Sequence, residues 1–435
     1  MSVVSYQLFS SEHVPRFDTL AAWLEWQTTL FPSAIALGLT RVAAVWTRLH
    51  PLPLPFPVIV VGGTNGKGSC VAMLEAIAQA AGYRTLSYTS PHLLHYNERI
   101  RRDGAAVSDA ALCAAFAQID HARGDIPLTY FEFGTLAALV LAATTAPDLA
   151  ILEVGLGGRL DAVNVIDADV AVVTSIGRDH TAWLGESLDE IALEKAGIFR
   201  AGRPAIIGQR NAPAGLRETA ERLGAVVQQL GREFDHLPAD NNWCWRCSNG
   251  DRLSLPVPTL RGLFQRDNAA AAVAALTSLR ERLPIPLNAI RLGLQRAQLP
   301  GRFQVFPGTP TWILDVAHNG AAAAALANNL RDFHCGGRLY AVLAVLADKE
   351  PEAIVAPLVP YVAQWFLAQS DDARALPVTE LAARVSGVLA RPAAGCFPDL
   401  DSALAAATAA ADQAQDAILV VGSFTTVSKQ LAALS

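Results

Sequence analysis

The sequence predicts an α/β protein in which helices cover parallel sheets and the chain is divided into two domains. Short apolar runs alternate with alanine-rich stretches of helical character almost to the end of the chain, which is typical of βαβ units. A glycine-rich turn follows the first of these runs and precedes a predicted helix. The length of 435 residues exceeds what one ordinary core accommodates, and it therefore favours two domains.

Nine apolar runs are predicted strands. Five of them lie in the first half of the chain, at Val58–Val61, Thr85–Tyr88, Ala150–Val154, Val170–Thr174 and Ala205–Ile207. The other four lie nearer its end, at Trp312–Val316, Tyr340–Val345, Gln364–Ala368 and Ile418–Val421. Helices are expected from Cys70 to Ala81, from about Arg266 to Arg282 and from about Leu287 to Ala297.

The alternation of strands and helices is interrupted near residues 232–260. The turn-forming pair Asn249-Gly250, together with Pro256 and Pro258, predicts a small antiparallel excursion in this region. Further along, Pro300-Gly301 interrupts regular structure and is the expected hinge between domains. We therefore expect a first domain over residues 1–298 and a second over residues 299–435, a plausible size for an α/β domain.

The composition excludes several classes of protein. Hydrophobic residues make up 52% of the chain and charged residues 17%, so the chain can bury a sizeable core and is not disordered. A net charge of −6 without any Lys/Arg cluster argues against nucleic acid as a partner. The apolar stretch at residues 133–147 is too short to span a bilayer, and no basic leader precedes an apolar stretch at the N-terminus. Neither a membrane nor a signal peptide is expected.

The cysteines predict a reducing, cytoplasmic setting, because six scattered residues do not make a disulfide framework. Cys244 and Cys247 form a single CxxC pair. A structural zinc site would need a second pair of ligands. The alternatives are therefore a zinc site and a surface hairpin, and the sequence favours the hairpin.

The segment Val58–Ser69, with the sequence VIVVGGTNGKGS, carries the clearest chemical signal. In a strand–turn–helix arrangement, backbone N–H groups and the helix N-terminus face a bound anion, with Lys67 suited to the outer phosphates and Ser69 to Mg²⁺. Three residues separate Gly62 from Gly66, where the common P-loop has four, and the additional Gly68 permits a wider turn. The alternative is an ordinary glycine turn that carries a surface lysine.

Polar residues follow other predicted strands, at the edge where parallel sheets bind ligands. Glu153 can hold Mg²⁺ opposite a P-loop, or it caps a loop or helix. Ser90 and His180 also follow strands, although a single serine there is more often a turn residue and a single histidine is weak evidence. Lys195 lies on a predicted helix that Gly197 ends early, and the alternative to a functional role is a solvated lysine.

A second polar cluster follows the first predicted strand of the second domain. It consists of Asp315, His318 and Asn319. Such a cluster would face any ligand held between the two domains.

Nine ordered segments resemble the Mur ligase superfamily, and specifically the bacterial dihydrofolate synthase/folylpolyglutamate synthases, from about residue 20 to the C-terminus. They are GTNGKGS (63–69), TSPHL (89–93), TYFEFGT (129–135), ILEVGLGGRLDAVN (151–164), DHTAWLG (179–185), EKAGIFR (194–200), GRFQ (301–304), DVAHN (315–319) and GSFTTV (422–427). Two positions depart from the family pattern: Thr425 replaces the usual histidine, and Gly320 replaces a common proline. Both departures concern details of nucleotide or glutamate binding.

The resemblance implies a large P-loop-type ATPase domain with a parallel sheet and a smaller Rossmann-like C-terminal domain, with the site between them. The implied ATP-binding residues are Asn65, Gly66, Lys67, Gly68, Ser69, Asn268, Arg302, Asp315 and His318. The implied ligands of Mg²⁺, expected at two sites, are Ser69, Ser90, Glu153, His180 and Lys195, of which Lys195 matches a lysine found carbamylated. The family's pteridine-binding positions fall on Leu37, Gly38, Leu39, Thr129, Tyr130, Phe131, Glu132, Leu160, Asp161 and Ala162.

The resemblance also implies a reaction, which is the ATP-dependent addition of L-glutamate to dihydropteroate and to tetrahydrofolate and its polyglutamates through an acyl phosphate. Lys67, Lys195 and His180 are then the catalytic residues of a cytoplasmic monomer. Three alternatives are less consistent with the sequence. Peptidoglycan ligases of the Mur type carry an additional UDP-binding domain, for which the 61 residues before Gly62 are too few. A GTPase would carry an NKxD motif, and the chain has no Asn-Lys pair. A purely regulatory nucleotide-binding protein would not need the pteridine-type segments.

Overall fold

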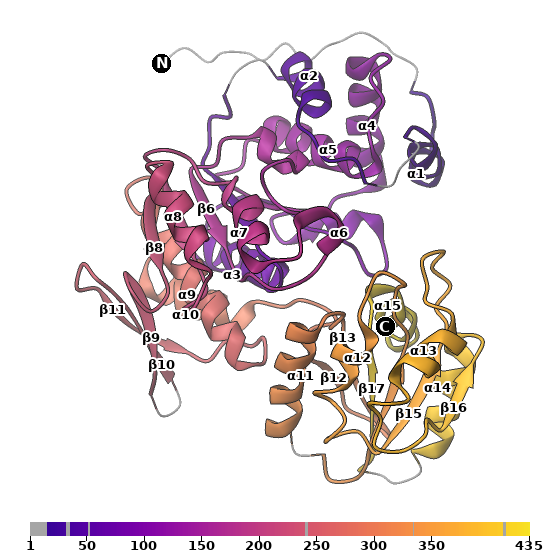
Figure 1. Cartoon of the computed structure of the whole chain (residues 1–435). Coiled ribbons are helices and arrows are strands. Elements are labelled where there is room, and N and C mark those ends of the chain that lie inside the picture. Colours follow the sequence, from indigo (N-terminus) through magenta and orange to yellow (C-terminus); the bar gives the residue numbers. More distant parts are fainter. Residues whose placement is uncertain (1–14, 32–34, 51–52, 240–241, 334, 412–414) are drawn as a thin grey trace.

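The computed structural model describes residues 15–31, 35–50, 53–239, 242–333, 335–411 and 415–435. The first 14 residues, in which the sequence predicts no signal peptide, lie outside this range. A large α/β body is followed by a smaller one, and a small separate sheet projects from the larger body (Figure 1). The predicted class of two α/β units with parallel sheets is confirmed.

The larger body is built on an eight-stranded sheet with the order β4-β3-β2-β5-β1-β6-β7-β8. Its strands are β1 (Val58–Gly62), β2 (Thr85–Tyr88), β3 (Ile100–Arg102), β4 (Ala105–Ala106), β5 (Leu149–Glu153), β6 (Val170–Val173), β7 (Pro204–Ile207) and β8 (Val226–Gln229). The six strands from β2 to β8 in this order pair in parallel, and β3 and β4 extend one edge as an antiparallel hairpin. All five predicted strands are present, each to within one residue.

Strand β1 shows why these strands are apolar along their whole length. Val58 and Val60 face one core, whereas Ile59 and Val61 face another on the opposite side of the sheet. The first core is covered by α1 (Leu20–Thr29), α2 (Thr40–Leu49), α4 (Asp109–Arg123), α5 (Tyr130–Thr145), α7 (Leu188–Ala196) and α8 (Ala214–Arg222). The second is covered by α3 (Lys67–Ala80), α9 (Leu263–Ser278) and α10 (Leu287–Arg296). Shorter turns are η1 (Tyr96–Arg99), η2 (Ala162–Val165) and α6 (Thr181–Leu184).

The apolar stretch at residues 133–147 lies in α5 up to Thr145, and this helix lies inside the first core. Thr129 begins this helix with a capping box, because its hydroxyl accepts from Glu132 N while the Glu132 carboxylate accepts from Thr129 N. Among the helices in the described ranges, none is both long enough and apolar enough to cross a bilayer.

The predicted antiparallel excursion is a three-stranded sheet with the order β11-β10-β9. Its strands are β9 (Phe234–Ala239), β10 (Asn242–Cys247) and β11 (Arg252–Pro256). Trp243 and Trp245 of β10 are buried, and they join this sheet to the second core. Cys244 and Cys247 lie on the same strand as free thiols. Because no three His, Cys, Asp or Glu side chains gather as a metal site within the described residues, the zinc alternative gains no support.

The smaller body is a six-stranded sheet with the order β12-β13-β17-β14-β15-β16, parallel except for β12. Its strands are β12 (Gln304–Phe306), β13 (Thr311–Asp315), β14 (Leu339–Leu343), β15 (Gln364–Ala368), β16 (Gly395–Phe397) and β17 (Ala417–Val421). One face carries α11 (Gly320–Asp332), α12 (Pro351–Val355) and α13 (Val378–Val385), and the other carries α14 (Leu400–Ala410) and α15 (Phe424–Leu434). The four predicted strands of this body are present to within two residues at each end.

Two helix boundaries differ from the prediction. Helix α3 begins at Lys67 and not at Cys70, because Gly66 adopts φ +86° and completes the turn there. Helix α9 spans Leu263–Ser278 and not residues 266–282, since Gly262, with φ +121°, sets its start. Both changes place polar residues within the first turns of helices. The predicted hinge at Pro300-Gly301 lies between α10 and β12, and the boundary near residue 299 stays a prediction.

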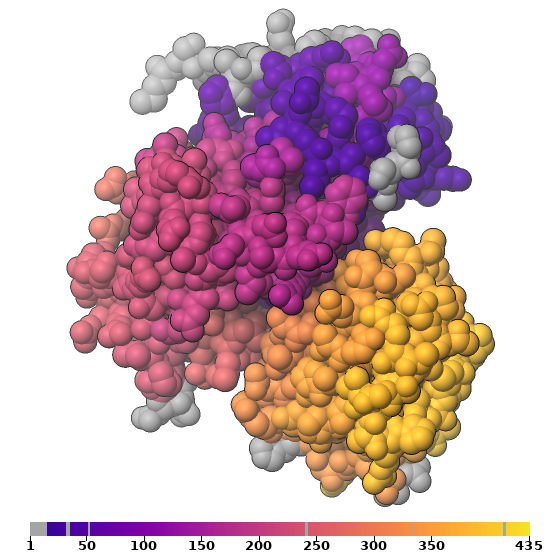
Figure 2. Space-filling view, viewed as in Figure 1, coloured from indigo at the N-terminus to yellow at the C-terminus, as the bar shows by residue number. Residues whose placement is uncertain are grey.

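The carboxyl ends of β1, β2, β5 and β6 open toward the smaller body. Figure 2 shows the smaller body, in orange and yellow, seated against the magenta surface of the larger one. The second body therefore covers the edge formed by the carboxyl ends of these strands, where the sequence predicts ligand binding.

The contact between α3 and α10 depends on a glycine. A Cβ atom at Gly293 of α10 would overlap the backbone of Ile77 in α3. We expect Gly293→Ala to lower the free energy of unfolding by about 1–3 kcal/mol, because the two helices must separate. Urea unfolding followed by circular dichroism measures this. Gly387→Ala is the control, since its Cβ meets nothing within 4 Å, and a change below about 0.5 kcal/mol is expected there. Equal stability of the two variants would contradict the prediction.

Candidate functional site

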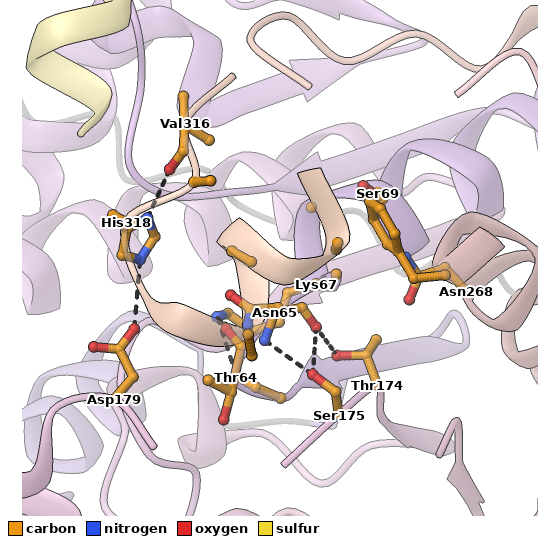
Figure 3. Close-up of a pocket in the computed structure, with 18 of the residues that line it drawn as sticks. Thr64, Asn65, Lys67, Ser69, Thr174, Ser175, Asp179, Asn268, Val316 and His318 are labelled. Carbon is orange, nitrogen blue, oxygen red and sulfur yellow. Dashed lines mark hydrogen bonds and ion pairs between the residues drawn. The ribbon is translucent and has the colours of Figure 1, made fainter. Parts of the chain in front are cut away.

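A cavity of about 360 Å³ lies between the two bodies (Figure 3). All the predicted phosphate, metal and ATP residues line it. From the larger body these are Asn65, Gly66, Lys67, Gly68, Ser69, Ser90, Glu153, His180, Lys195 and Asn268, and from the smaller body Arg302, Asp315 and His318. The structure thus brings together thirteen residues that are spread over some 250 positions of the sequence.

The turn between β1 and α3 is held by its neighbours. Its Asn65 carbonyl accepts from the hydroxyls of Thr174 (2.7 Å) and Ser175 (3.0 Å), which follow β6 (Figure 3). Since α3 begins at Lys67, the N–H groups of residues 67–69 belong to its first turn and point away from the helix. The Lys67 ammonium donates to the carbonyls of Gly63 (3.1 Å) and Thr64 (3.2 Å). The turn therefore offers an anion both free amides and a positive charge.

Three side chains with oxygen or nitrogen lone pairs surround this turn. Glu153 is buried, accepts from Ser90 N at 3.2 Å, and has its carboxyl pKa raised by burial, against the effect of nearby Lys67. The Ser69 hydroxyl accepts from Gln265 Nε2 at 3.2 Å. Burial lowers the pKa of His180 to about 4, so its imidazole is neutral at physiological pH. Carboxylate, hydroxyl and neutral imidazole groups can all serve as ligands of a divalent cation.

Lys195 is buried, and its ammonium donates to the Gly63 carbonyl at 3.0 Å. The solvated-lysine alternative is therefore wrong. A pairing with the neighbouring Glu194 is also absent, because Glu194 pairs with Arg159 at 2.7 Å. Burial, with a further contribution from Lys67, lowers the pKa of Lys195 to about 7. A substantial fraction of this side chain is consequently a neutral amine near pH 7.

The smaller body contributes one wall of the cavity. The Asp315 carboxylate accepts from the N–H groups of Phe303 (2.9 Å) and Ala317 (2.8 Å), and burial raises its pKa. The Arg302 guanidinium lies 5.1 Å from the ring centroid of Phe424, and burial lowers its pKa. His318 donates from Nδ1 to the Val316 carbonyl at 2.8 Å.

The predicted pteridine segments gather beside the cavity but do not line it. Gly38 N donates to the Leu160 carbonyl at 3.0 Å, which joins the first segment to the third. The ring of Phe131 packs so closely on Gly155, a residue of the cavity wall, that no side chain fits there. Asp161 accepts from Leu156 N and Val163 N, and burial raises its pKa to about 6. Leu37, Leu39, Thr129, Tyr130, Glu132 and Ala162 complete the three segments.

Several residues of the site, or in contact with it, carry no signal of a role in the sequence. Asp179 precedes His180 in the segment DHTAWLG (179–185), but nothing in the sequence indicates a function for it. Gln265 contacts Ser69 from α9, and Lys349 approaches from the loop after β14. No local sequence signal marks Gln265 or Lys349, because their contacts are made only across the fold.

Two family models match the chain in order. "Mur ligase middle domain" matches residues 61–276, and "Mur ligase, glutamate ligase domain" matches residues 301–424. The dihydrofolate synthase/folylpolyglutamate synthase of Escherichia coli K12 is 44% identical over 409 residues, which cover 94% of each chain.

Solved structures give the same picture. E. coli FolC in complex with DHPP and ADP superposes with a TM-score of 0.89 at 41% identity, covering 97% of this chain and 99% of that one. A bifunctional folylpolyglutamate synthase/dihydrofolate synthase with Mn, AMPPNP and L-glutamate bound gives 0.87 at 43% identity, with 96% and 98% covered.

Burial of Lys195 has a consequence for stability. Its pKa is about 7 in the folded protein against 10.5 ordinarily, so between these values the unfolded chain binds a proton that the folded chain does not. The free energy of unfolding of the wild type, measured relative to that of Lys195→Met, should therefore rise with pH from about 7 toward 10. The rise is at most about 1.4 kcal/mol per pH unit. Urea unfolding of both proteins at pH 7, 8 and 9, in buffer free of bicarbonate, measures this. Parallel pH profiles would show that the amine stays charged.

Proposed function

The chain belongs to the dihydrofolate synthase/folylpolyglutamate synthase family of the Mur ligase superfamily, and from this membership we propose how its cavity makes an amide bond. It is an ATP-dependent ligase of folate metabolism that adds L-glutamate to dihydropteroate and to tetrahydrofolate or its polyglutamates. ATP and a divalent metal ion take part in the reaction. The roles of individual residues below are proposals.

One observation carries the proposal: a glycine-rich turn at a helix N-terminus, a buried carboxylate and a polar wall from a second body share one cavity. A carboxylate does not react with an amine at neutral pH, because oxide is a poor leaving group. Transfer of the γ-phosphoryl group of ATP converts it to an acyl phosphate. The α-amine of glutamate then attacks the acyl carbon, phosphate leaves, and the amine loses a proton.

Phosphate binding falls to the turn between β1 and α3. Lys67 exchanges its carbonyl partners for phosphate oxygens, and the N–H groups of Gly66, Gly68 and Ser69 hold the remaining charge. The Asn65 N–H donates to Ser175 Oγ at 3.0 Å and so holds the turn in place. Catalysis of phosphoryl transfer consists mainly of positioning and charge neutralisation, so no side-chain nucleophile is required.

The donor set around the turn fits Mg²⁺. Ser69, Ser90, Glu153 and His180 supply hydroxyl, carboxylate and neutral imidazole donors on the wall of one cavity. Too few of them are carboxylates for a cage made of protein alone, which is typical of magnesium that shares its shell with phosphates and water. When bound, Mg²⁺ neutralises charge on the transferred phosphoryl group. The raised pKa of the Glu153 carboxyl indicates a buried group that a cation would stabilise in its charged form.

ATP is held from the opposite side by Asn268, Arg302, Asp315 and His318. Asn268 lies against Gly66 of the turn, so it reaches the nucleotide from α9. Arg302, Asp315 and His318 belong to the smaller body. With both bodies around the nucleotide, water is kept from the acyl phosphate.

The folate-type substrate binds against the three pteridine segments beside the cavity, and its carboxylate is directed past Gly155 toward the phosphates. Support comes from the contact between Phe131 and Gly155, which joins these segments to the cavity wall. Every proposed site residue comes from one chain, and we therefore propose a monomer.

The purified protein with ATP, Mg²⁺ and radiolabelled L-glutamate should form product with dihydropteroate and, separately, with tetrahydrofolate. Lys67→Ala should abolish both activities, because the charge that neutralises the phosphoryl group is gone. Lys429→Ala is the control, since this lysine pairs with Asp401 on the surface of the smaller body and should leave activity unchanged. Product with tetrahydrofolate alone would restrict the enzyme to chain elongation, and turnover of Lys67→Ala within a few-fold of wild type would refute the phosphate-binding role.

We further propose that Lys195 reacts with CO₂ to form a carbamate. The neutral amine attacks CO₂, an N–C bond forms and a proton is released. An ammonium has no lone pair for a metal, whereas a carbamate supplies oxygen ligands. Support comes from the burial of Lys195 and from its pKa of about 7, which provides the neutral amine.

Crystals grown with bicarbonate should show three additional atoms on Lys195 Nζ, and Lys195→Ala should lose activity. The same crystals grown without CO₂ are the control for unmodified density. A bare ammonium in bicarbonate, together with full activity of Lys195→Ala, would exclude the carbamate.

A further inference from the structure

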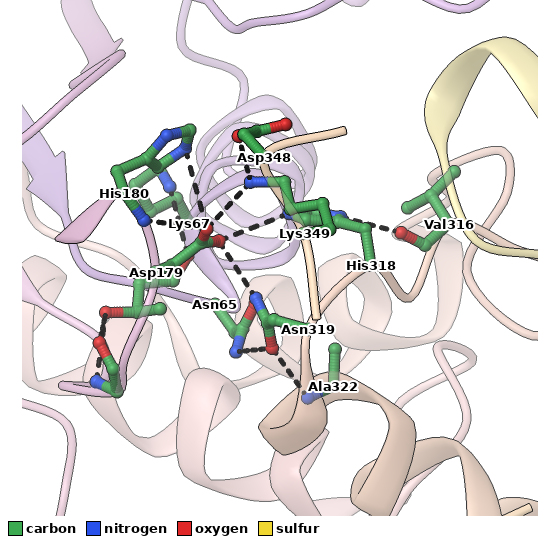
Figure 4. Close-up of polar contacts among 12 residues, drawn as sticks. Asn65, Lys67, Asp179, His180, Val316, His318, Asn319, Ala322, Asp348 and Lys349 are labelled. Carbon is green, nitrogen blue, oxygen red and sulfur yellow. Dashed lines mark hydrogen bonds and ion pairs between the residues drawn. The ribbon is translucent and has the colours of Figure 1, made fainter. Parts of the chain in front are cut away.

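Asp179 has no part in the mechanism proposed above, yet it receives contacts from both bodies. It lies after β6 at the carboxyl edge of the large sheet, and its side chain is 8% exposed. From its own body, His180 N donates to its carboxylate at 2.9 Å. His180 Nε2 also lies 3.9 Å from Asp179 Oδ1. Further contacts come from the smaller body (Figure 4).

Three side chains of the smaller body converge on this one carboxylate. Lys349 Nζ donates to Oδ1 at 2.8 Å, and Asn319 Nδ2 donates to Oδ2 at 3.0 Å. His318 Nε2 lies 3.4 Å from Oδ2. These three side chains follow two different strands, since His318 and Asn319 follow β13 and Lys349 follows β14. Asp179 is thus a shared acceptor for two loops of the other body.

Asn319 extends the contact to the phosphate-binding turn. Its carboxamide pairs reciprocally with that of Asn65, with both N–H···O distances at 3.1 Å. The same Asn319 oxygen accepts from Ala322 N at 2.9 Å and so caps α11. The turn, the strand end that carries Asp179 and the start of α11 are therefore connected through adjacent side chains.

The charge match is made where water is largely excluded. Lys349 is 7% exposed at its side chain, similar to Asp179. A buried ion pair needs both members, because removal of one leaves an uncompensated charge. Asp179 and Lys349 belong to different bodies. Each of these two charges therefore has its partner only when the two bodies are in contact. Without Asp179, the acidic partner left to Lys349 among the described residues is Asp348, which lies 3.2 Å away on the exposed side.

We propose that Asp179 is a positioning residue, which draws Lys349, Asn319 and His318 of the smaller body onto the larger one and closes the cavity in the arrangement that ligation requires. Its action on the reaction is indirect, through His318, through its neighbour His180 and, by way of Asn319, through Asn65. The inference rests on the proposed function only in its kinetic readout.

The test begins with Asp179→Asn, which keeps the shape and removes the charge. We expect kcat for glutamate ligation to fall about 100-fold, the scale of a misplaced catalytic wall, while KM for dihydropteroate, held by the larger body, stays unchanged. Small-angle scattering with AMPPNP and Mg²⁺ should give a larger radius of gyration for the variant than for wild type. An unchanged kcat, or equal radii, would overturn the inference.

A double-mutant cycle separates this role from a general loss of structure. Lys349→Met and the double variant should show that the second substitution adds little to the first, because both remove one contact. If the fold-loss of kcat in the double variant equalled the product of the losses in the two single variants, the inference would be overturned.

Asp169→Asn is the matched control. Asp169 precedes β6 as Asp179 follows it, and it pairs with Arg203 and Arg282 within the larger body. Its replacement should leave kcat and the radius of gyration unchanged even if the melting temperature falls. If Asp169→Asn lost as much kcat as Asp179→Asn, the loss in both variants would be due to lower stability alone, and the inference would be overturned. If the wild type ligates no glutamate, the proposed function fails, and the scattering comparison still decides the role of Asp179.

Discussion

The close packing of one turn, between β1 and α3, is the constraint on which the rest of the site depends. A side chain at Gly63 would overlap Thr174 after β6, and one at Gly66 would overlap Asn268 of α9. Main-chain atoms therefore line the cavity at these points, which lets a phosphate approach the backbone N–H groups. The positions of β6 and α9 follow from the same contacts, and those two elements carry Asp179 and Gln265 to the site.

Two lysines of the site compete for one hydrogen-bond acceptor. Lys67 and Lys195 both donate to the Gly63 carbonyl, so two amines lie near one acceptor in a place with little water. The pKa of Lys195 falls because burial disfavours its charge and Lys67 adds repulsion. An arriving triphosphate would relieve the repulsion at Lys67. The site thus lowers the pKa of Lys195 and prepares that side chain for neutral-amine chemistry.

The fold could be predicted from the sequence where strands are buried on both faces, as Val58–Val61 illustrates. The strands that escaped prediction, β3, β4, β8, β12 and β16, lie at or beside the edges of the sheets, where burial is partial and the apolar run is short or broken. The thirteen predicted residues of the cavity wall could be identified because most of them follow a strand or lie in a segment that resembles the family. Their individual roles, and the pteridine segments, came from family resemblance and not from local pattern. Lys349 and Gln265 could not be found, since contacts between distant parts leave no trace in local sequence.

The Gly63 carbonyl has an implication for how this site can be studied. It is the common acceptor of both amines, and it is a main-chain atom. Saturation mutagenesis changes side chains only, so no library of variants samples its loss. Substitutions at position 63 would report crowding against Thr174, which a deep mutational scan would record as intolerance without revealing the acceptor. Replacement of a backbone amide by an ester, through chemical synthesis or genetic code expansion, weakens a carbonyl acceptor and would expose this contribution.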